Sequence, residues 1–197
     1  MHVIRRTEVF AKWVEALADL KGRARVLARI ERLASGHPGD SRPVGEGVSE
    51  LRIDYGPGYR VYFLRTEGVV MSCLLEVTRA RRLVTSGPQF DWLEISEDNM
   101  VKTQTSKYDV SEHLRTTEEM VAYFEACLEE APDDAAFIAK ALGDIARAKG
   151  MSSVARDSGL SRESLYKALS GERSPDFATI LRVMSALGLR LHARAQP

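Results

Sequence analysis

The sequence predicts an α+β fold class: a small mixed domain of order β-α-α-β-β-β, followed by an all-α domain. Two observations predict it. Apolar residues alternate with the two-residue period of strands at several places before residue 76, but recur only at helical spacing after residue 100. The charge is also uneven, with 12 basic against 9 acidic residues in 1–75, 3 against 9 in 101–139, and 10 against 5 in 140–197. Two basic regions indicate two surfaces suited to nucleic acid, and the acidic region suits a basic partner.

The first domain opens with a short β-branched segment, residues 2–6, for which a strand is predicted. Thr7 can cap the helix that follows. That helix has one predicted apolar face, made of Val9, Phe10, Trp13, Val14, Leu17 and Leu20. Lys21-Gly22 is expected to end it. A second helix is predicted over residues 23–33, with its arginines on the surface: Arg23, Arg25, Arg29 and Arg32.

Three strands are predicted after a loop at His37-Pro38-Gly39-Asp40. Residues 48–53 and 59–64 alternate apolar and polar side chains, and a Gly-Pro-Gly turn at 56–58 separates them. Residues 69–75 form the third strand. These elements complete the first predicted domain, 1–77.

Residues 78–107 are predicted to be a linker, because 78–99 carry no regular apolar pattern. The second domain is predicted over 108–197 and reads as helical throughout. Thr117 is expected to cap its first long helix, and Pro132-Asp133-Asp134 the next, which should end at Gly150.

Residues 151–187 predict a helix-turn-helix element. A short helix should begin at Ser152 or Ser153 and end at Ser158, Gly159 supplies a turn that needs a positive φ, and Ser161 caps a second short helix. A plain helical bundle is the weaker alternative, because this tight arrangement is uncommon in such bundles. The residues expected to face DNA are Ser152, Ser161, Arg162, Glu163, Ser164, Tyr166 and Lys167.

At these residues the chain resembles a known family. The stretches Ala141 to Met151 and Gly159 to Leu169 resemble the HigA-type addiction-module antidote proteins, which carry a lambda-repressor-like helix-turn-helix. The resemblance extends from Tyr108 to about His192. It implies a protein that binds operator DNA, represses its own module and dimerises to read paired half-sites. Met100 lies where an antidote of this type would begin.

The first domain resembles a different family through Arg5 to Phe10 and Pro43 to Phe63. Those stretches are similar to HigB-like addiction-module killer proteins of the RelE superfamily. The resemblance implies a metal-independent, ribosome-dependent mRNA endoribonuclease, or mRNA interferase, without a cofactor. Residues suited to that chemistry are Arg52, Tyr59, Arg60 and Tyr62. Residues suited to RNA phosphates are Arg23, Arg25 and Arg29.

The chain departs from the killer family after its last predicted strand. Such proteins continue with Gly-Gly-Asp-Lys and a basic helix, whereas residues 71–99 match neither. Met71 to Arg79 can be encoded by codons that, read two bases later, give Val-Leu-Leu-Ala-Gly-Gly-Asp-Lys. The hypothesis is therefore that a frameshift near Val70 fused two adjacent genes and cost the killer domain its C-terminal tail. The nucleotide sequence tests this directly.

Together these patterns predict a type II toxin–antitoxin fusion with an impaired ribonuclease half. Two alternatives stay open: a plain transcription regulator with a non-catalytic N-terminal remnant, and an active ribonuclease inhibited in cis. The expected partners are operator DNA, mRNA with the ribosome, the opposite half of the module, and a second copy of the chain. Cys73 and Cys127 lie in unrelated segments, and no signal-peptide-like apolar stretch follows Met1, so a cytoplasmic setting is expected.

Overall fold

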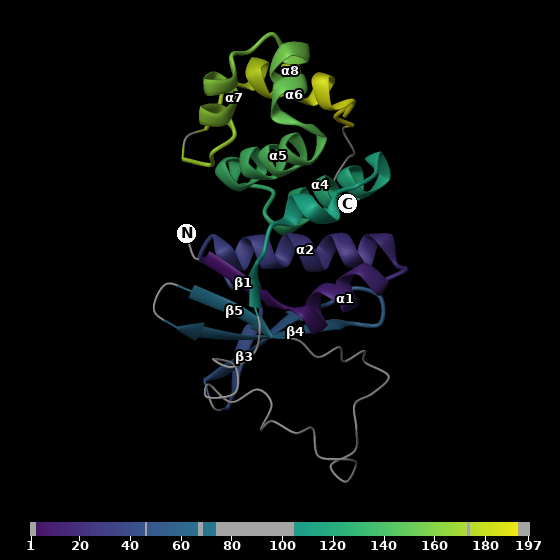
Figure 1. Cartoon of the computed structure of the whole chain (residues 1–197), viewed down its shortest axis with the longest axis vertical. Helices are drawn as coiled ribbons and strands as arrows, with labels where there is room; N and C mark the ends of the chain where they lie inside the picture. Colours follow the sequence, from purple (N-terminus) through teal and green to yellow (C-terminus); the bar gives the residue numbers. More distant parts are fainter. Residues whose placement is uncertain (1–2, 46, 67–68, 74–104, 173, 193–197) are drawn as a thin grey trace. The chain divides into compact units, whose positions relative to one another are not determined.

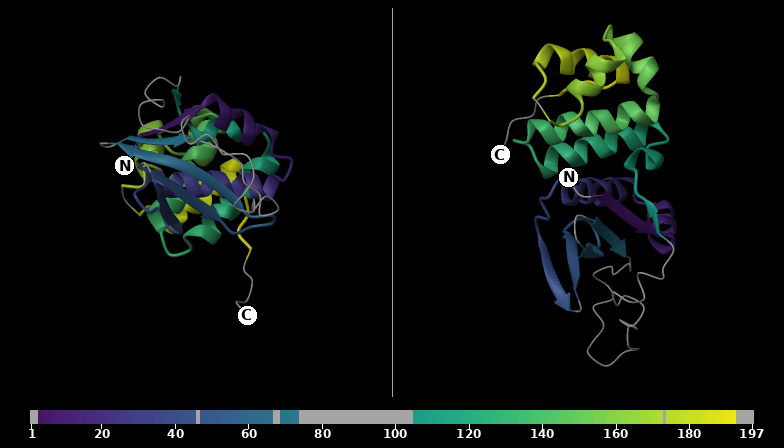
Figure 2. Two further views of the ribbon diagram at one scale, coloured as in Figure 1. Left: turned by 90° about the horizontal axis from the view of Figure 1, so that it is seen from below. Right: turned by 60° about the vertical axis from the view of Figure 1, so that its left-hand side comes forward.

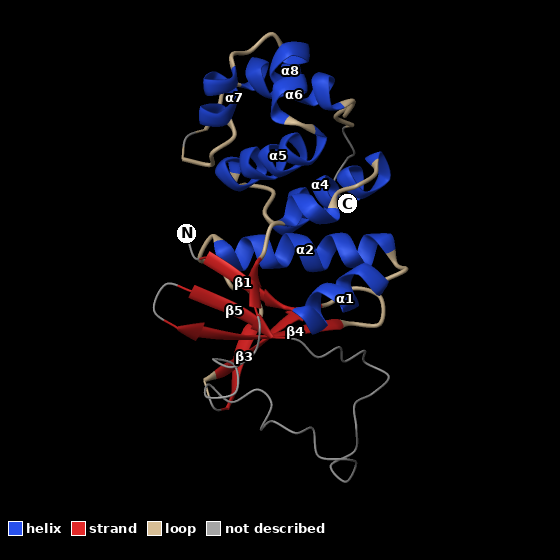
Figure 3. Ribbon diagram, viewed as in Figure 1, coloured by secondary structure: helices blue, strands red, loops and turns tan. Residues whose placement is uncertain are grey.

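The computed structural model describes residues 3–45, 47–66, 69–73, 105–172 and 174–192. The chain is mixed α and β, with a helical C-terminal region (Figures 1 and 3). It divides into two compact units, Met1–Asp109 and Val110–Pro197. Among the described helices, none is both long and apolar enough to cross a bilayer.

The first unit is built on a six-stranded sheet of order β2-β3-β4-β5-β1-β6. Its strands are β1 (Val3–Thr7), β2 (Ser41–Gly45), β3 (Val48–Ile53), β4 (Tyr59–Thr66), β5 (Val69–Cys73) and β6 (Thr105–Lys107). β1 pairs with β5 in parallel, and the remaining pairs are antiparallel. Two helices, α1 (Glu8–Ala16) and α2 (Leu20–Ala34), lie against one face of the sheet (Figure 1).

The predicted strand at 48–53 is confirmed, and the strand predicted at 59–64 extends to Thr66. β2 and β6 were not predicted. β2 is an edge strand that contains Pro43, and β6 is short and polar, so neither carries the alternating apolar pattern by which strands are recognised. β6 lies within the predicted linker, while residues 74–104, which make up most of that linker and of the frameshift hypothesis, lie outside the described residues.

The boundary between the first two helices differs from the prediction. Thr7 caps α1 as expected, with its hydroxyl accepting a hydrogen bond from the Phe10 amide at 3.2 Å. The break, however, falls before Leu20, and the Asp19 carboxylate caps α2 by accepting from the Gly22 amide at 3.0 Å. Gly22 therefore lies inside α2. A Cβ there would sit 2.6 Å from the Tyr59 hydroxyl, so the glycine permits helix and sheet to approach closely.

The core of the first unit lies between the two helices and the sheet. Phe10 and Val14 of α1 and Val26, Leu27, Ile30 and Leu33 of α2 are buried, as predicted. Val9 was expected in this core but is 60% exposed, because the short α1 buries only a narrow stripe. Arg29 was expected at the surface and is 7% exposed.

The described residues of the second unit form a 3₁₀ turn, Val110–His113, and the helices α4 (Thr117–Glu130), α5 (Ala135–Lys149), α6 (Met151–Ser158), α7 (Arg162–Ala168) and α8 (Phe177–Leu187). α4 and α5 pack side by side (Figure 2). Thr116, one residue earlier than predicted, caps α4 in a reciprocal capping box with Glu119. Asp134 caps α5, and Gly150, the predicted end of this helix, is its C-cap.

A buried polar pair joins α4 to α5. Tyr123 and Asp144 are fully buried, and the Tyr123 hydroxyl donates to the Asp144 carboxylate at 2.8 Å. Arg147 donates to the other carboxylate oxygen at 2.6 Å. The apolar stripe predicted for α8 is only partly buried: Met184 and Leu187 are in the core, whereas Phe177 is 66% and Leu181 is 45% exposed.

Candidate nucleic-acid interfaces

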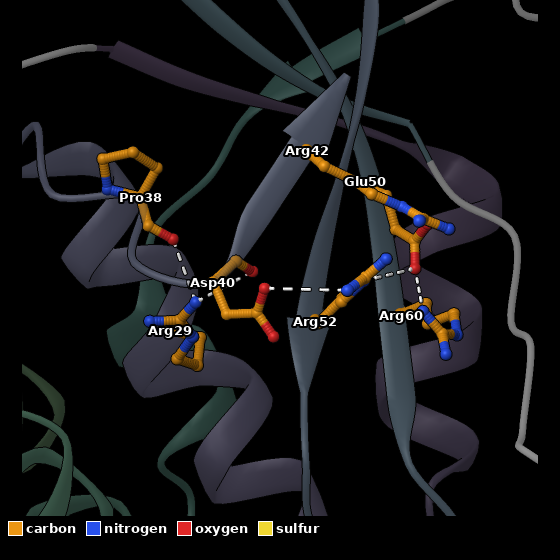
Figure 4. A network of polar contacts seen from close by, with 7 residues as sticks. All are labelled: Arg29, Pro38, Asp40, Arg42, Glu50, Arg52 and Arg60. Carbon is orange, nitrogen blue, oxygen red and sulfur yellow. Dashed lines mark hydrogen bonds and ion pairs between the residues drawn. The ribbon is translucent and has the colours of Figure 1, made fainter. Parts of the chain in front are cut away.

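Three arginines from β2, β3 and β4 converge on one buried carboxylate, that of Glu50 (Figure 4). One carboxylate oxygen accepts from Arg52 Nε at 3.2 Å and from an Arg60 Nη. The other accepts from Arg42 Nε at 3.4 Å. The Glu50 side chain is only 4% exposed, whereas Arg52 and Arg60 are 30% and 26% exposed. The carboxylate therefore fixes guanidinium groups that solvent can still reach.

The sheet itself brings these side chains together. Arg52 lies directly opposite Arg60, and Glu50 directly opposite Tyr62. Because successive residues of a strand point to opposite faces, these four side chains share one face of the sheet. The residues between them, Leu51 and Val61, are buried on the other face.

The cluster carries a small positive surplus. Asp40 adds a second carboxylate, 3.9 Å from Arg52, so three guanidinium groups face two carboxylates. An anion approaching this face would meet donors that are already oriented, although Glu50 occupies the point on which they converge. The arrangement favours phosphate binding over proton abstraction.

Tyr62 lies on the same face as these arginines, and its phenol is protonated at neutral pH. Partial burial raises the pKa of the Tyr62 phenol above its ordinary value, and this outweighs the lowering by the neighbouring charges, chiefly Arg60. At neutral pH the phenol is therefore a hydrogen-bond donor or a stacking surface, and not a general base.

The four predicted catalytic residues do not stay together. Arg52, Arg60 and Tyr62 share a face, but Tyr59 points into the core, where it is 5% exposed and its hydroxyl donates to Asp19 at 3.0 Å. The strand alternation already separates Tyr59 from Arg60, its immediate neighbour. Glu50 was missed, although it stands two residues before Arg52 and thus on the same face.

The predicted RNA-phosphate residues have different surroundings. Arg29 is buried and donates from one Nη to the carbonyls of Pro38 and Asp40, at 2.9 and 3.4 Å. It fixes the loop before β2, so its expected position at the surface is wrong. Arg25 lies over the Tyr55 ring, 4.4 Å from its centroid, and Arg23 is half-buried on α2.

The second candidate surface is carried by α6 and α7. All seven residues predicted to face DNA are exposed: Ser152, Ser161, Arg162, Glu163, Ser164, Tyr166 and Lys167. Gly159 ends α6 at φ +69°, the positive φ that was predicted. The Ser161 hydroxyl then caps α7 by accepting from the Ser164 amide at 3.0 Å. Three residues thus connect α6 to α7, and the polar side of α7 is exposed.

The opposite side of α7 is anchored in the core. Leu165 is fully buried and Leu169 is 5% exposed. Gly143 of α5 allows the end of α7 to approach, since a Cβ there would lie 2.8 Å from the Leu169 carbonyl oxygen. The exposed residues of α7 are therefore presented from a fixed support.

Among the described residues, no group of His, Cys, Asp and Glu side chains is arranged to hold a metal ion.

Comparison with known proteins identifies the helical part of the chain. Residues 104–195 match the family described as "Probable addiction module antidote protein". An uncharacterized protein of Haemophilus influenzae is 50% identical over 91 residues, which cover 46% of this chain and 92% of that protein. A second uncharacterized protein of the same organism is 44% identical over 71 residues, covering 36% and 72%. No solved structure matches the chain.

The chain is thus a mixed α+β protein whose helical part is of the antidote type. It belongs to the family of probable addiction module antidote proteins through residues 104–195, and this membership places it in the context of a toxin–antitoxin module.

Proposed function

We propose that the chain is a type II toxin–antitoxin fusion whose C-terminal part binds operator DNA and represses the module. The observation that carries the proposal is that an antidote-family sequence, residues 104–195, shares one chain with an α+β unit whose residues 1–75 carry 12 basic and 9 acidic side chains. A killer-type domain in the same chain would give that antidote its partner.

The DNA-binding half of the proposal rests on α6 and α7. In a helix-turn-helix, the second helix enters the major groove with its polar side toward base edges and phosphates. α7 has the matching features: a buried Leu165 on one side, and exposed Arg162 and Lys167 on the other. A homodimer would present two such helices to two half-sites. α6 and α7 would then be the reading element.

Replacing Arg162 or Lys167 with alanine is expected to weaken operator binding by about 1–3 kcal/mol each, roughly 5- to 150-fold in Kd. The probe is a DNA duplex that covers the region upstream of the gene, measured by fluorescence anisotropy. Loss of a phosphate contact should also lower the slope of log K against log salt by about 1.

Arg182→Ala provides the charge-matched control, since Arg182 is an exposed arginine on α8. Its binding should stay close to that of the parent chain. If the Arg162 and Lys167 variants bound the duplex as tightly as the parent chain, α7 would not be part of the DNA interface.

For the first unit we propose descent from a HigB-like, RelE-type mRNA interferase, with impaired activity. Arg52, Arg60 and Tyr62 supply phosphate donors and a base-stacking surface on one sheet face, which supports the descent. The Gly-Gly-Asp-Lys segment of such killers has no counterpart after β5, which supports the impairment. The frameshift remains the proposed origin of that loss.

An active ribonuclease inhibited in cis is the second candidate, favoured by the solvent access of Arg52 and Arg60. Expression of residues 1–99 alone, without the antidote-family part, separates the readings. No effect on growth or mRNA supports an impaired remnant, or a plain regulator if the full chain binds the operator. Growth arrest with mRNA cleavage that disappears in an Arg52→Ala, Arg60→Ala double variant supports the enzyme.

A further inference from the structure

The boundary of the antidote family and the boundary of the structural units do not coincide. The family match begins at residue 104, whereas the second unit begins at Val110. The first residues of the antidote sequence therefore fold with the first unit. Residues 105–107 form β6, an edge strand of its sheet.

The backbone of this segment pairs with β1. Arg5 lies opposite Lys107, Arg6 opposite Ser106, and Thr7 opposite Thr105. The Tyr108 amide extends the ladder by donating to the Ile4 carbonyl at 3.0 Å. Because hydrogen-bonded pairs alternate along an antiparallel ladder, the Ser106 amide faces β1 and the Lys107 amide faces away from it.

Side chains make the pairing selective. Arg5 reaches across to Thr105, donating from Nε to its hydroxyl at 2.8 Å and from an Nη to its carbonyl at 2.7 Å. Arg6 donates to the Ser106 hydroxyl at 3.3 Å. Tyr108 is 6% exposed, with its ring centroid 6.2 Å from that of Phe10. Two hydroxyl residues and a buried aromatic anchor thus characterise the segment.

We propose that the β1 edge is the docking site for the N-terminal segment of the antidote, and that residues 105–108 occupy it in cis. This inference rests on the proposed toxin–antitoxin relation between the two parts. Without β6, β1 would present unpaired backbone groups, and an edge of that kind accepts an extended peptide by strand addition. When its own strand is released, the edge takes the same segment from a second antidote chain.

The first experiment compares two proline variants of the full chain. Ser106→Pro removes an amide that faces β1, whereas Lys107→Pro removes one that faces outward and serves as the matched control. Amide hydrogen exchange at Arg6, which faces β6, should accelerate about tenfold or more in Ser106→Pro and stay near the parent rate in Lys107→Pro. Exchange at Arg5, which faces β5, should remain unchanged in both. Equal Arg6 rates in parent and Ser106→Pro would overturn the pairing.

The second experiment tests docking in trans. A fluorescent peptide of residues 105–114 should bind the Ser106→Pro chain, whose edge is vacant, and not the parent, whose edge is filled. A peptide carrying Lys107→Pro should bind equally well, and one carrying Ser106→Pro should lose binding by about tenfold or more. A Tyr108→Ala chain, which keeps every backbone amide, provides a second vacant edge if Ser106→Pro fails to fold. Failure of the peptide to bind either chain would overturn the proposal.

These readouts are independent of the proposed DNA binding. The proline variants alter residues outside α6 and α7, so operator affinity should stay at the parent value in both. If the parent chain did not bind the operator, the proposed function would be contradicted, but the hydrogen-exchange and peptide-binding results would still test the pairing at β1. Normal operator binding with no peptide docking would contradict only the strand proposal.

Discussion

Leu165→Ala is expected to lower the free energy of unfolding of the second unit by about 2–5 kcal/mol. Leu165 is the fully buried residue of α7, so its truncation removes apolar contacts and leaves a cavity. Amide hydrogen exchange of α5 and α7, recorded at increasing urea concentration, measures the free energy of unfolding of this unit separately from that of the first. Operator binding should fall with it, because α7 loses its support.

Tyr166→Ala is the control, one residue along the same helix. Tyr166 is 47% exposed, so its truncation should change the free energy of unfolding by no more than about 0.5 kcal/mol. It should nevertheless weaken operator binding if its ring lies in the interface. A Leu165 variant as stable as the Tyr166 variant would contradict the described packing of α7.

Glu50→Gln is expected to lower the free energy of unfolding of the first unit by about 2–3 kcal/mol. Breaking a buried ion pair by removing one partner commonly costs about 3–5 kcal/mol. The expected loss for Glu50→Gln is smaller because Arg52 and Arg60 are 30% and 26% exposed, so solvent screens their charges. Arg52 and Arg60 then stand directly opposite each other without the buried carboxylate between them, which is unfavourable across a strand pair. The loss should shrink as salt is added.

The same substitution should raise affinity for single-stranded RNA, because the three arginines lose the carboxylate at their centre. Anisotropy of a labelled RNA oligonucleotide measures this. Asp40→Asn is the control: its carboxylate is 65% exposed and 3.9 Å from Arg52, so its removal should cost less than about 1 kcal/mol. If Glu50→Gln were as stable as Asp40→Asn, the buried carboxylate would not be organising the cluster.

Local signals in the sequence were sufficient for elements whose geometry depends on a few neighbouring residues. The Gly159 turn, the Ser161 cap and the strand at 48–53 were predicted because each follows from a specific residue preference or a two-residue period. Exposure of the seven predicted DNA-facing residues followed from the same helical pattern.

Features created by distant parts of the chain could not be predicted in this way. Burial of Arg29 depends on its hydrogen bonds to carbonyls of a loop that begins nine residues later. Gly22 was predicted to end a helix, because the local sequence does not show that this glycine packs against Tyr59 of the sheet. Glu50 looks like an ordinary surface glutamate until β2, β3 and β4 are side by side. β6 lacks any apolar pattern, since its pairing depends on backbone groups and hydroxyls.

The position of β6 also bears on the proposed gene fusion. β5 and β6 both flank β1, and Ser72 lies opposite Arg6 while Thr105 lies opposite Thr7. β5 and β6 are thus about two strand spacings apart, roughly 10 Å. The entropy of closing a chain between two such neighbouring points grows slowly, by about 0.6 kcal/mol for each doubling of length. Under the proposed fusion, a change in the number of residues at the junction would therefore cost the sheet little free energy.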